Sequence, residues 1–288
     1  MKVILLGALG QLGRSIQKNF SDSIELIKFT KEELSITDPK YLREVFEIHK
    51  PDFVINAAAY TEVDKAEIER NKANETNNKS LVYLVDLSNE FNFVLIHFST
   101  DYVFNGKSHL PYTELSKVQP INFYGLTKSL GDKHIIDKCL KFYIFRVSWL
   151  YSPYSNNFVT KMIDLSKQDS LTVINDQYGR PTSSIYLSKF LYKLILGDYQ
   201  LPFGLYNFSS SGVEVSWSGF AEKIFFYSLE KKLINSIPKI IEISSKDYKA
   251  KALRPSYSVL SNEKLERNIN SSLPNWQELL VEDIKLIK

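Results

Sequence analysis

The sequence is poor in the residues that make disulfides and cysteine-based metal sites. Among its 288 residues it has one cysteine, Cys139, which excludes an internal disulfide framework. Cys139 lies in an apolar helical pattern, so we expect a small buried side chain. No run approaches the roughly 18 uninterrupted apolar residues of a membrane span. The first apolar segment is interrupted at Gly7, too early for a signal peptide, and we therefore expect a cytoplasmic protein.

An excess of one charge is also missing. The 36 Lys and Arg residues are scattered and nearly balanced by 33 Asp and Glu, for a net charge of +3. This balance does not indicate a nucleic acid or membrane partner. We find no repeat, low-complexity segment or flexible linker. The chain is long enough for one large domain or two smaller ones.

A glycine turn follows the first predicted strand. Residues 3–6 are an apolar run, and the next seven residues place glycines at 7, 10 and 13. Leu12, Ile16 and Phe20 then recur at helical spacing. A strand, a glycine turn and a helix in this order are typical of a pyrophosphate site at a helix amino terminus, although a plain tight turn is the alternative.

The end of the second predicted strand, residues 24–29, bears on the choice of cofactor. A carboxylate at this place would bind the adenosine ribose of NAD. The sequence instead has Thr30 and Lys31, with Lys28 nearby, and a lysine can accept a 2′-phosphate. We therefore favour NADPH over NADH, although Glu32 and Glu33 are close by.

Strand and helix patterns alternate through the first half of the chain. A third strand, residues 52–61, ends in small residues that include Ala57, Ala58 and Ala59. These would let a cofactor lie against the backbone; tight packing of a helix on the sheet is the alternative. The alternation predicts an α/β fold with a Rossmann-like, doubly wound parallel sheet. We expect an NAD(P)-binding domain over residues 1–151 and a smaller, interleaved substrate-binding lobe over residues 152–288.

Three residues suggest carbonyl chemistry. Tyr124 and Lys128 are four positions apart, so on a helix they share a face. A cation there would lower the phenol pKa from about 10 and make Tyr124 a general acid or base. Thr100 ends a predicted buried strand, where its hydroxyl could bind the same substrate oxygen. Such a Tyr and Lys pair is common by chance, so its weight comes from the surrounding dinucleotide pattern.

The second half supplies candidates for the substrate. Trp149 ends a predicted strand and could stack on a sugar ring, although a core position is the alternative. Asn157 begins a predicted helix. Arg254 stands before a proline in a loop, where a bidentate phosphate contact competes with an ordinary surface position.

Motifs along nearly the whole chain resemble the extended short-chain dehydrogenase/reductases, and within them the dTDP-4-dehydrorhamnose reductase family. The most specific matches are Ala-Ala-Ala-Tyr-Thr at 57–61, Ser-Thr-Asp-Tyr-Val-Phe at 99–104 and Asp-Gln-Tyr-Gly at 176–179. The Gly-Gln-Leu-Gly at 10–13 and the Tyr-Gly-x-Thr-Lys at 124–128 are general to the superfamily.

The resemblance implies a reductase that converts the C4 ketone of dTDP-4-dehydro-β-L-rhamnose to dTDP-L-rhamnose with NADPH or NADH. Thr100, Tyr124 and Lys128 would be catalytic, and Thr100, Asp101, Trp149, Asn157 and Arg254 would contact the substrate. The expected cofactor-binding residues are Gly7, Gly10, Gln11, Leu12, Gly13, Thr30, Ser35, Ile36, Ala57, Ala58, Ala59, Tyr60, Thr61, Tyr124 and Lys128.

Two departures and several alternatives accompany this interpretation. The helix motif reads Gly131-Asp132 where the family often has Gly-Glu, and Arg14-Ser15 offers no acidic residue for a metal at a dimer contact, so no metal is expected. We expect a monomer or homodimer. The alternatives are a sister reductase that makes dTDP-6-deoxy-L-talose, a dehydratase or epimerase, and a non-catalytic subunit resembling the regulatory subunit of methionine adenosyltransferase.

Overall fold

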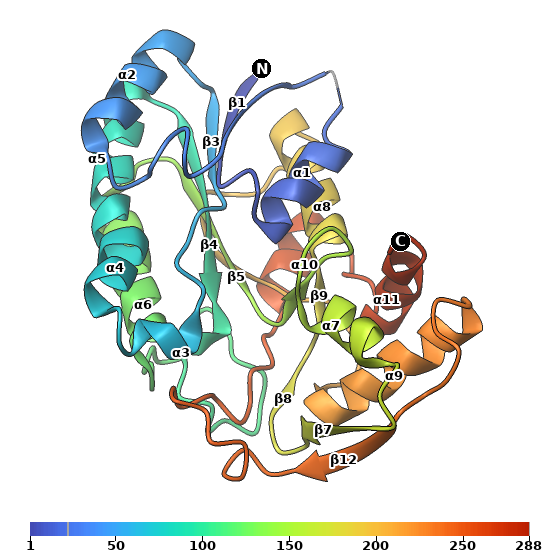
Figure 1. The fold of residues 1–288 in the computed structure, drawn as a ribbon. Coiled ribbons are helices and arrows are strands. Elements are labelled where there is room, and N and C mark those ends of the chain that lie inside the picture. The colour runs from blue at the N-terminus through green and yellow to red at the C-terminus, as the bar shows by residue number, and fades with distance from the viewer. Residues whose placement is uncertain (22, 288) are drawn as a thin grey trace.

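Six parallel strands form the central sheet of the computed structural model, which describes residues 1–21 and 23–287 (Figure 1). The strand order is β10-β5-β4-β3-β1-β2, so the chain winds in opposite directions on either side of the boundary between β1 and β3. The predicted doubly wound parallel sheet is confirmed. Ligands of such sheets bind beyond the carboxyl ends of the strands at this reversal. The strands are β1 (Lys2–Leu6), β2 (Glu25–Phe29), β3 (Phe53–Asn56), β4 (Val94–Thr100), β5 (Phe142–Val147) and β10 (Gly204–Phe208).

Helices cover both faces of this sheet. Strand β1 shows why: Val3 and Leu5 pack in one apolar cluster, and Ile4 and Leu6 in the other, as the alternation of a strand requires. Burying each of these side chains contributes roughly 1.5–3 kcal/mol to folding. One face is covered by α1 (Gln11–Asn19), α8 (Ser184–Leu196) and α10 (Glu263–Ile269), and the other by α2 (Pro39–His49), α5 (Ser80–Phe91) and α6 (Phe123–Lys138).

The segment before β4 is helical throughout but widens into a π-helical turn. It consists of α4 (Arg70–Asn74), the π turn η1 (Glu75–Lys79) and then α5. Asn77 in the π turn binds the backbone N–H and C=O of Tyr60, and its amide also donates to Thr127 on α6. This turn therefore holds the loop after β3, which includes the short helix α3 (Val63–Ala66), against α6.

A second, smaller core lies beside the sheet. It contains Tyr151, Met162, Phe220 and Trp276, among other buried side chains. Segments that follow residue 151 contribute to both cores, because α8 and β10 return to the main sheet. The remaining elements are η2 (Asp101–Val103), β6 (Leu150–Tyr151), α7 (Phe158–Leu165), β7 (Ser170–Ile174), β8 (Tyr178–Gly179), β9 (Thr182–Ser183), β11 (Val215–Ser216), α9 (Trp217–Glu230), β12 (Lys239–Ile243) and α11 (Trp276–Ile284).

Local sequence signals account for several helix boundaries. Asp38 caps α2 through its carboxylate, with Pro39 at the first helical position, and Ser216 caps α9. Cys139 is buried as expected, but it caps the carboxyl end of α6 instead of lying within the helix. Within the described residues, no helix has the length and apolar character needed to span a membrane.

Candidate active site

The main cavity opens at the carboxyl ends of the central strands and has a volume of about 580 Å³. Thr100, Tyr124 and Lys128 all line it, although they come from β4 and α6. Gly10 and Ala59, from the loops after β1 and β3, line the same cavity. The structure therefore brings the three predicted catalytic residues next to the predicted cofactor loops.

A second cavity of about 420 Å³ continues the first along the switch point of the sheet. It is lined by Gly7, Ser35 and Ile36, and it shares Gly10 with the main cavity. An elongated ligand can therefore lie across Gly10 with one end in each cavity. The predicted cofactor residues Ala57 and Ala59 line both cavities, Ala58 and Tyr60 line the second, and Gln11, Leu12 and Thr61 line the main one.

The glycine turn is shaped by close backbone contacts. Gly7 has a φ of 82°, and a Cβ there would lie 2.7 Å from the backbone nitrogen of Ala58. A Cβ on Gly13 would lie 2.3 Å from the carbonyl oxygen of Gly7, so helix α1 packs directly on the turn. Gly13 lies at this packing contact and lines neither cavity, whereas Gly10 lines both.

The end of β2 also differs from the prediction in one residue. The Thr30 hydroxyl accepts from the N–H of Glu33, and the Glu33 carboxylate accepts from the N–H of Thr30 at 2.8 Å. Both side chains are thus occupied in a local turn, and Thr30 does not line the cavity. Lys31 lines it instead, next to Ser35 and Thr37. From this turn, the Lys31 ammonium group faces the second cavity, and neither the Glu32 nor the Glu33 carboxylate does.

Helix α6 is positioned by its first turn. The Asn122 side chain accepts from the N–H of Gly125 at 2.8 Å and donates to the carbonyl of Leu253. A Cβ on Gly125 would lie 2.1 Å from the carbonyl oxygen of Tyr102, so the helix presses on the segment that follows β4. This contact brings Tyr124 next to Tyr102, with ring centroids 5.6 Å apart, and towards Thr100.

The protonation of Tyr124 corrects a further prediction. Burial raises the pKa of Tyr124 above its usual value, and the polar contact with Thr100 only partly opposes the rise. Lys128 Nζ is directed elsewhere: it donates to the carbonyl of Phe98 at 2.7 Å and contacts His97 Nε2 at 3.0 Å. The phenol in this structure therefore holds its proton at neutral pH.

Burial also governs the other ionisable groups of the cavity. It lowers the pKa of Lys128 to about 8, against a smaller opposing effect of the Asp132 carboxylate. It raises the pKa of Asp101 to about 6. Asp101 accepts a hydrogen bond from the Thr100 hydroxyl at 3.0 Å. A donor hydroxyl, a protonated phenol and an ammonium group thus face one cavity, an arrangement that can stabilise and protonate a developing alkoxide.

The chain matches known proteins over its full length. The family model described as RmlD substrate binding domain matches residues 1–288. A dTDP-4-dehydrorhamnose reductase from Aggregatibacter actinomycetemcomitans is 35% identical over 97% of each chain. The dTDP-4-dehydrorhamnose reductase from Bacillus anthracis, solved in complex with NADP, is 35% identical, with a TM-score of 0.92 over 98% of each chain. The corresponding structure from Clostridium acetobutylicum is also 35% identical, with a TM-score of 0.92 over 99% of each chain.

The chain belongs to the dTDP-4-dehydrorhamnose reductase family. The resemblance noted in the sequence is thereby confirmed. In this family member, Trp149 lines the main cavity with one ring face against Trp217. The Trp149 ring thus faces the cavity only with the part that Trp217 and Gly179 leave uncovered.

Two of the predicted substrate residues, Asn157 and Arg254, do not line the main cavity. The Asn157 side chain caps α7 and also donates to the carbonyl of Ser155 at 2.8 Å, so its amide is fully occupied and it does not line the cavity. Ser155 and Asn156 line the cavity in place of Asn157. Both belong to the polar run that ends at Asn157, and this run could have indicated them from the sequence.

Arg254 lies in a separate hollow of about 320 Å³, together with Lys161, Phe158 and Trp217. It donates to the Asp64 carboxylate at 2.9 Å, so a bidentate phosphate contact would have to share the guanidinium group with Asp64. Tyr102 and Val63 are two further residues of the main cavity that the sequence analysis did not assign.

Proposed function

We propose that this protein reduces the C4 ketone of dTDP-4-dehydro-β-L-rhamnose with NADPH and releases dTDP-L-rhamnose. The proposal rests above all on one observation: Thr100, Tyr124 and Lys128 line the cavity that continues past Gly10 into the second cavity. Membership of the dTDP-4-dehydrorhamnose reductase family and the NADP complex of the relative from Bacillus anthracis support the choice of substrate and cofactor.

The residues of the second cavity fit a dinucleotide. A Cβ on Gly10 would meet only the Gly7 carbonyl oxygen, at 3.4 Å, so the backbone is open to a pyrophosphate at the amino terminus of α1. Ser35 and Ile36 would enclose the adenosine, and Lys31 would pair with the 2′-phosphate. When bound, NADPH supplies the hydride that is added to C4.

Three side chains complete the reduction. Thr100 turns its hydroxyl proton from Asp101 to the C4 oxygen, donates a hydrogen bond there and so orients the ketone. Tyr124 gives its proton to the oxygen as negative charge develops there, and burial keeps that proton on the phenol until it is needed. Lys128 presents its ammonium group to the same cavity, where it can bind a ribose hydroxyl of the cofactor.

The substrate would extend from the main cavity past Trp149. The Trp149 ring would pack against the sugar. Beyond the Trp149 and Trp217 pair, the hollow that contains Phe158, Lys161 and Arg254 would hold the nucleotide, with the two cations near the diphosphate.

The decisive experiment is an assay of NADPH oxidation with enzymatically prepared dTDP-4-keto-6-deoxy sugar, with and without its 3,5-epimerase. We expect oxidation only with the epimerase present, and NMR of the product to show the C4 configuration of L-rhamnose. A 6-deoxy-L-talose product would favour the sister reductase.

The Tyr124→Phe protein should lose about 10²- to 10⁴-fold in kcat while it still binds NADPH. Full activity of this variant would contradict the assigned role of Tyr124, and no turnover by the wild type would favour a binding subunit.

The same preparation tests two further expectations. We propose a monomer or a homodimer, which light scattering measures, and a cytoplasmic location, which cell fractionation measures. A larger assembly or a membrane-bound fraction would contradict them.

A further inference from the structure

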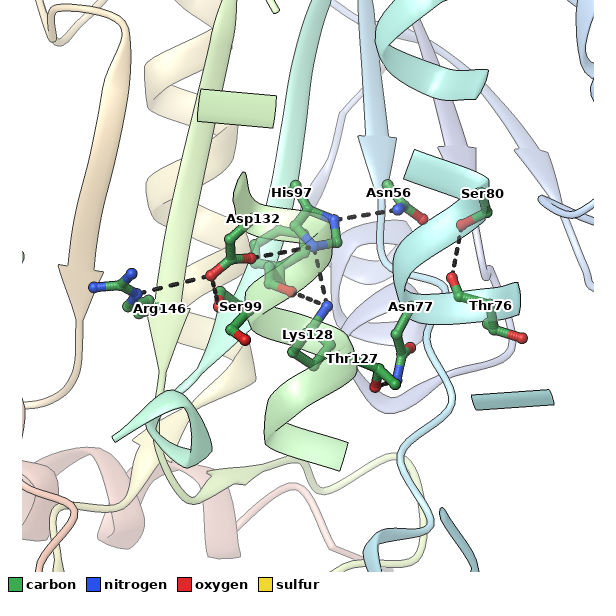
Figure 2. Close-up of polar contacts among 12 residues, drawn as sticks. Asn56, Thr76, Asn77, Ser80, His97, Ser99, Thr127, Lys128, Asp132 and Arg146 are labelled. Carbon is green, nitrogen blue, oxygen red and sulfur yellow. Dashed lines mark hydrogen bonds and ion pairs between the residues drawn. The ribbon is translucent and has the colours of Figure 1, made fainter. Parts of the chain in front are cut away.

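A cluster of buried polar side chains surrounds Lys128 (Figure 2). It consists of His97, Ser99, Lys128, Asp132 and Arg146, and none of these residues is more than 3% exposed. His97, Asp132 and Arg146 do not line the main cavity. Burying charged and polar groups is costly unless they bind one another, so a cluster of this kind calls for a reason.

The contacts of Lys128 suggest that reason. An ammonium group has three N–H donors and no acceptor. One is directed to the carbonyl of Phe98 at 2.7 Å and a second to His97 Nε2 at 3.0 Å. The third remains for the cavity that Lys128 also lines. The direction of that third donor is therefore fixed by the two partners on the sheet.

His97 is itself held in place. Its Nδ1 lies 3.2 Å from the Asn56 side-chain amide, at the carboxyl end of the neighbouring strand β3. Since a lysine ammonium group only donates, Nε2 must accept, so the ring is neutral and its one proton lies on Nδ1. The Asn56 amide then has to turn its oxygen, in place of its nitrogen, towards Nδ1. Burial, with the nearby Lys128 charge, lowers the pKa of His97 well below its usual value and keeps the ring neutral.

We propose that His97 is a positioning residue for Lys128: its neutral imidazole accepts one N–H of the ammonium group, keeps Lys128 charged, and aims the remaining N–H into the active site. This inference rests on the proposed role of Lys128 in the reduction. His97 does not touch the cavity and acts only through Lys128.

The charged groups around Lys128 come from four segments. Tyr124 and Asp132 lie on α6, His97 on β4, Asp101 directly after β4, and Arg146 on β5. The Asp132 carboxylate accepts from Ser99, lies 3.8 Å from Arg146 Nε and supports the charge of Lys128. Loss of the His97 acceptor would add to the desolvation of the ammonium group and lower the pKa of Lys128 further.

The test compares His97→Gln with His97→Met in the full-length enzyme, with NADPH and the keto sugar. Gln and Met have nearly the same size and shape, but only Gln can place an acceptor near the position of Nε2. We expect H97M to lose about tenfold or more in kcat at neutral pH, since the acceptor binds a charged donor. The alkaline limb of its kcat profile should also move to lower pH. H97Q should retain the wild-type profile and most of the activity.

Equal profiles for H97M and H97Q would overturn the proposal, because His97 would then only fill space. If H97M does not fold, H97N replaces it, since the shorter amide reaches the Nδ1 position but not Nε2; wild-type behaviour of H97N would then overturn the proposal. The Lys128→Met variant separates the proposed role of Lys128 in the reduction from the proposed role of His97 in positioning Lys128. Full activity of K128M would contradict the role of Lys128 itself, whereas an inactive K128M with equal H97M and H97Q would contradict only the role of His97.

Discussion

The indole rings of Trp149 and Trp217 stack with their centroids 3.6 Å apart and their planes 7° apart. Trp149 lines the main cavity, whereas Trp217 lines the neighbouring hollow. Trp149 also has a φ of 48°, a backbone conformation that a bulky residue rarely adopts and that its packing must hold. Trp217 therefore fixes Trp149, a residue of the proposed sugar site, without lining the main cavity itself.

This stack predicts a selective effect of Trp217→Leu. An aromatic pair contributes about 0.5–1.5 kcal/mol beyond the area it buries, so the KM for the keto sugar should rise about three- to tenfold. The KM for NADPH should stay constant, because Trp217 lies away from the glycine turn, and it serves as the internal control. Steady-state kinetics with each substrate varied in turn would check this. An unchanged KM for the sugar would show that Trp149 keeps its position without the stack.

Features that depend on local sequence were predictable. The alternation of apolar strands and periodic helices indicated the sheet, and the capping residues Asp38 and Ser216 marked where two helices begin. The three catalytic candidates could be placed at one site because Thr100 ends a strand and a parallel sheet gathers its strand ends at one edge.

Features that depend on partners distant in the sequence were not predictable. The Lys128 ammonium group was expected to act on the phenol, but its two partners lie about 30 residues earlier on β4. Arg254 forms an ion pair with Asp64, 190 residues away. The Asn157 side chain caps its own helix, α7, and donates to the carbonyl of Ser155. Sequence spacing indicates which chemical role a side chain could have. Which of its possible hydrogen-bond partners the side chain contacts depends on the packed structure.

The glycine turn predicts different outcomes for two similar substitutions. Gly13→Ala would place a methyl group 2.3 Å from the Gly7 carbonyl oxygen, so we expect a loss of about 1–3 kcal/mol in the free energy of unfolding and weaker NADPH binding. Gly10→Ala meets its nearest atom at 3.4 Å, so the protein should keep its stability but bind NADPH less well. Thermal unfolding and fluorescence titration of both variants would check this. Equal stability of the two would contradict the packing assigned to Gly13.

Lys31 predicts the cofactor preference. It lines the second cavity, whereas Lys28, three residues earlier on β2, is exposed and does not line it. Lys31→Ser should raise the KM for NADPH about ten- to a hundredfold and leave that for NADH nearly constant, since a charge-assisted hydrogen bond contributes about 1.5–3 kcal/mol. Lys28→Ser is the matched control and should change neither. If Lys28→Ser had the larger effect, the 2′-phosphate would have to bind on the other side of β2.

Asp283 on α11 predicts part of the pH dependence of stability. It lies in the smaller core, where its carboxylate accepts from Ser183 at 2.6 Å. Burial raises the pKa of Asp283 from 3.8 to about 6. A folded-state pKa above the unfolded one means that the folded protein holds the proton more tightly. This contribution to stability is complete below pH 4 and is lost as the pH rises through 6.

Asp283→Asn removes this titration while it keeps the size of the side chain. Between pH 5 and pH 7.5 the wild type should lose about 1 kcal/mol in the free energy of unfolding relative to the variant, because one pKa unit corresponds to about 1.4 kcal/mol. Urea denaturation at both pH values measures the difference. Asp169→Asn, at an exposed aspartate of the same lobe, is the control and should follow the wild type at each pH. If Asp283→Asn also followed the wild type, the Asp283 carboxyl would already be ionised at pH 5, and the hydrogen bond from Ser183 would have to outweigh its burial.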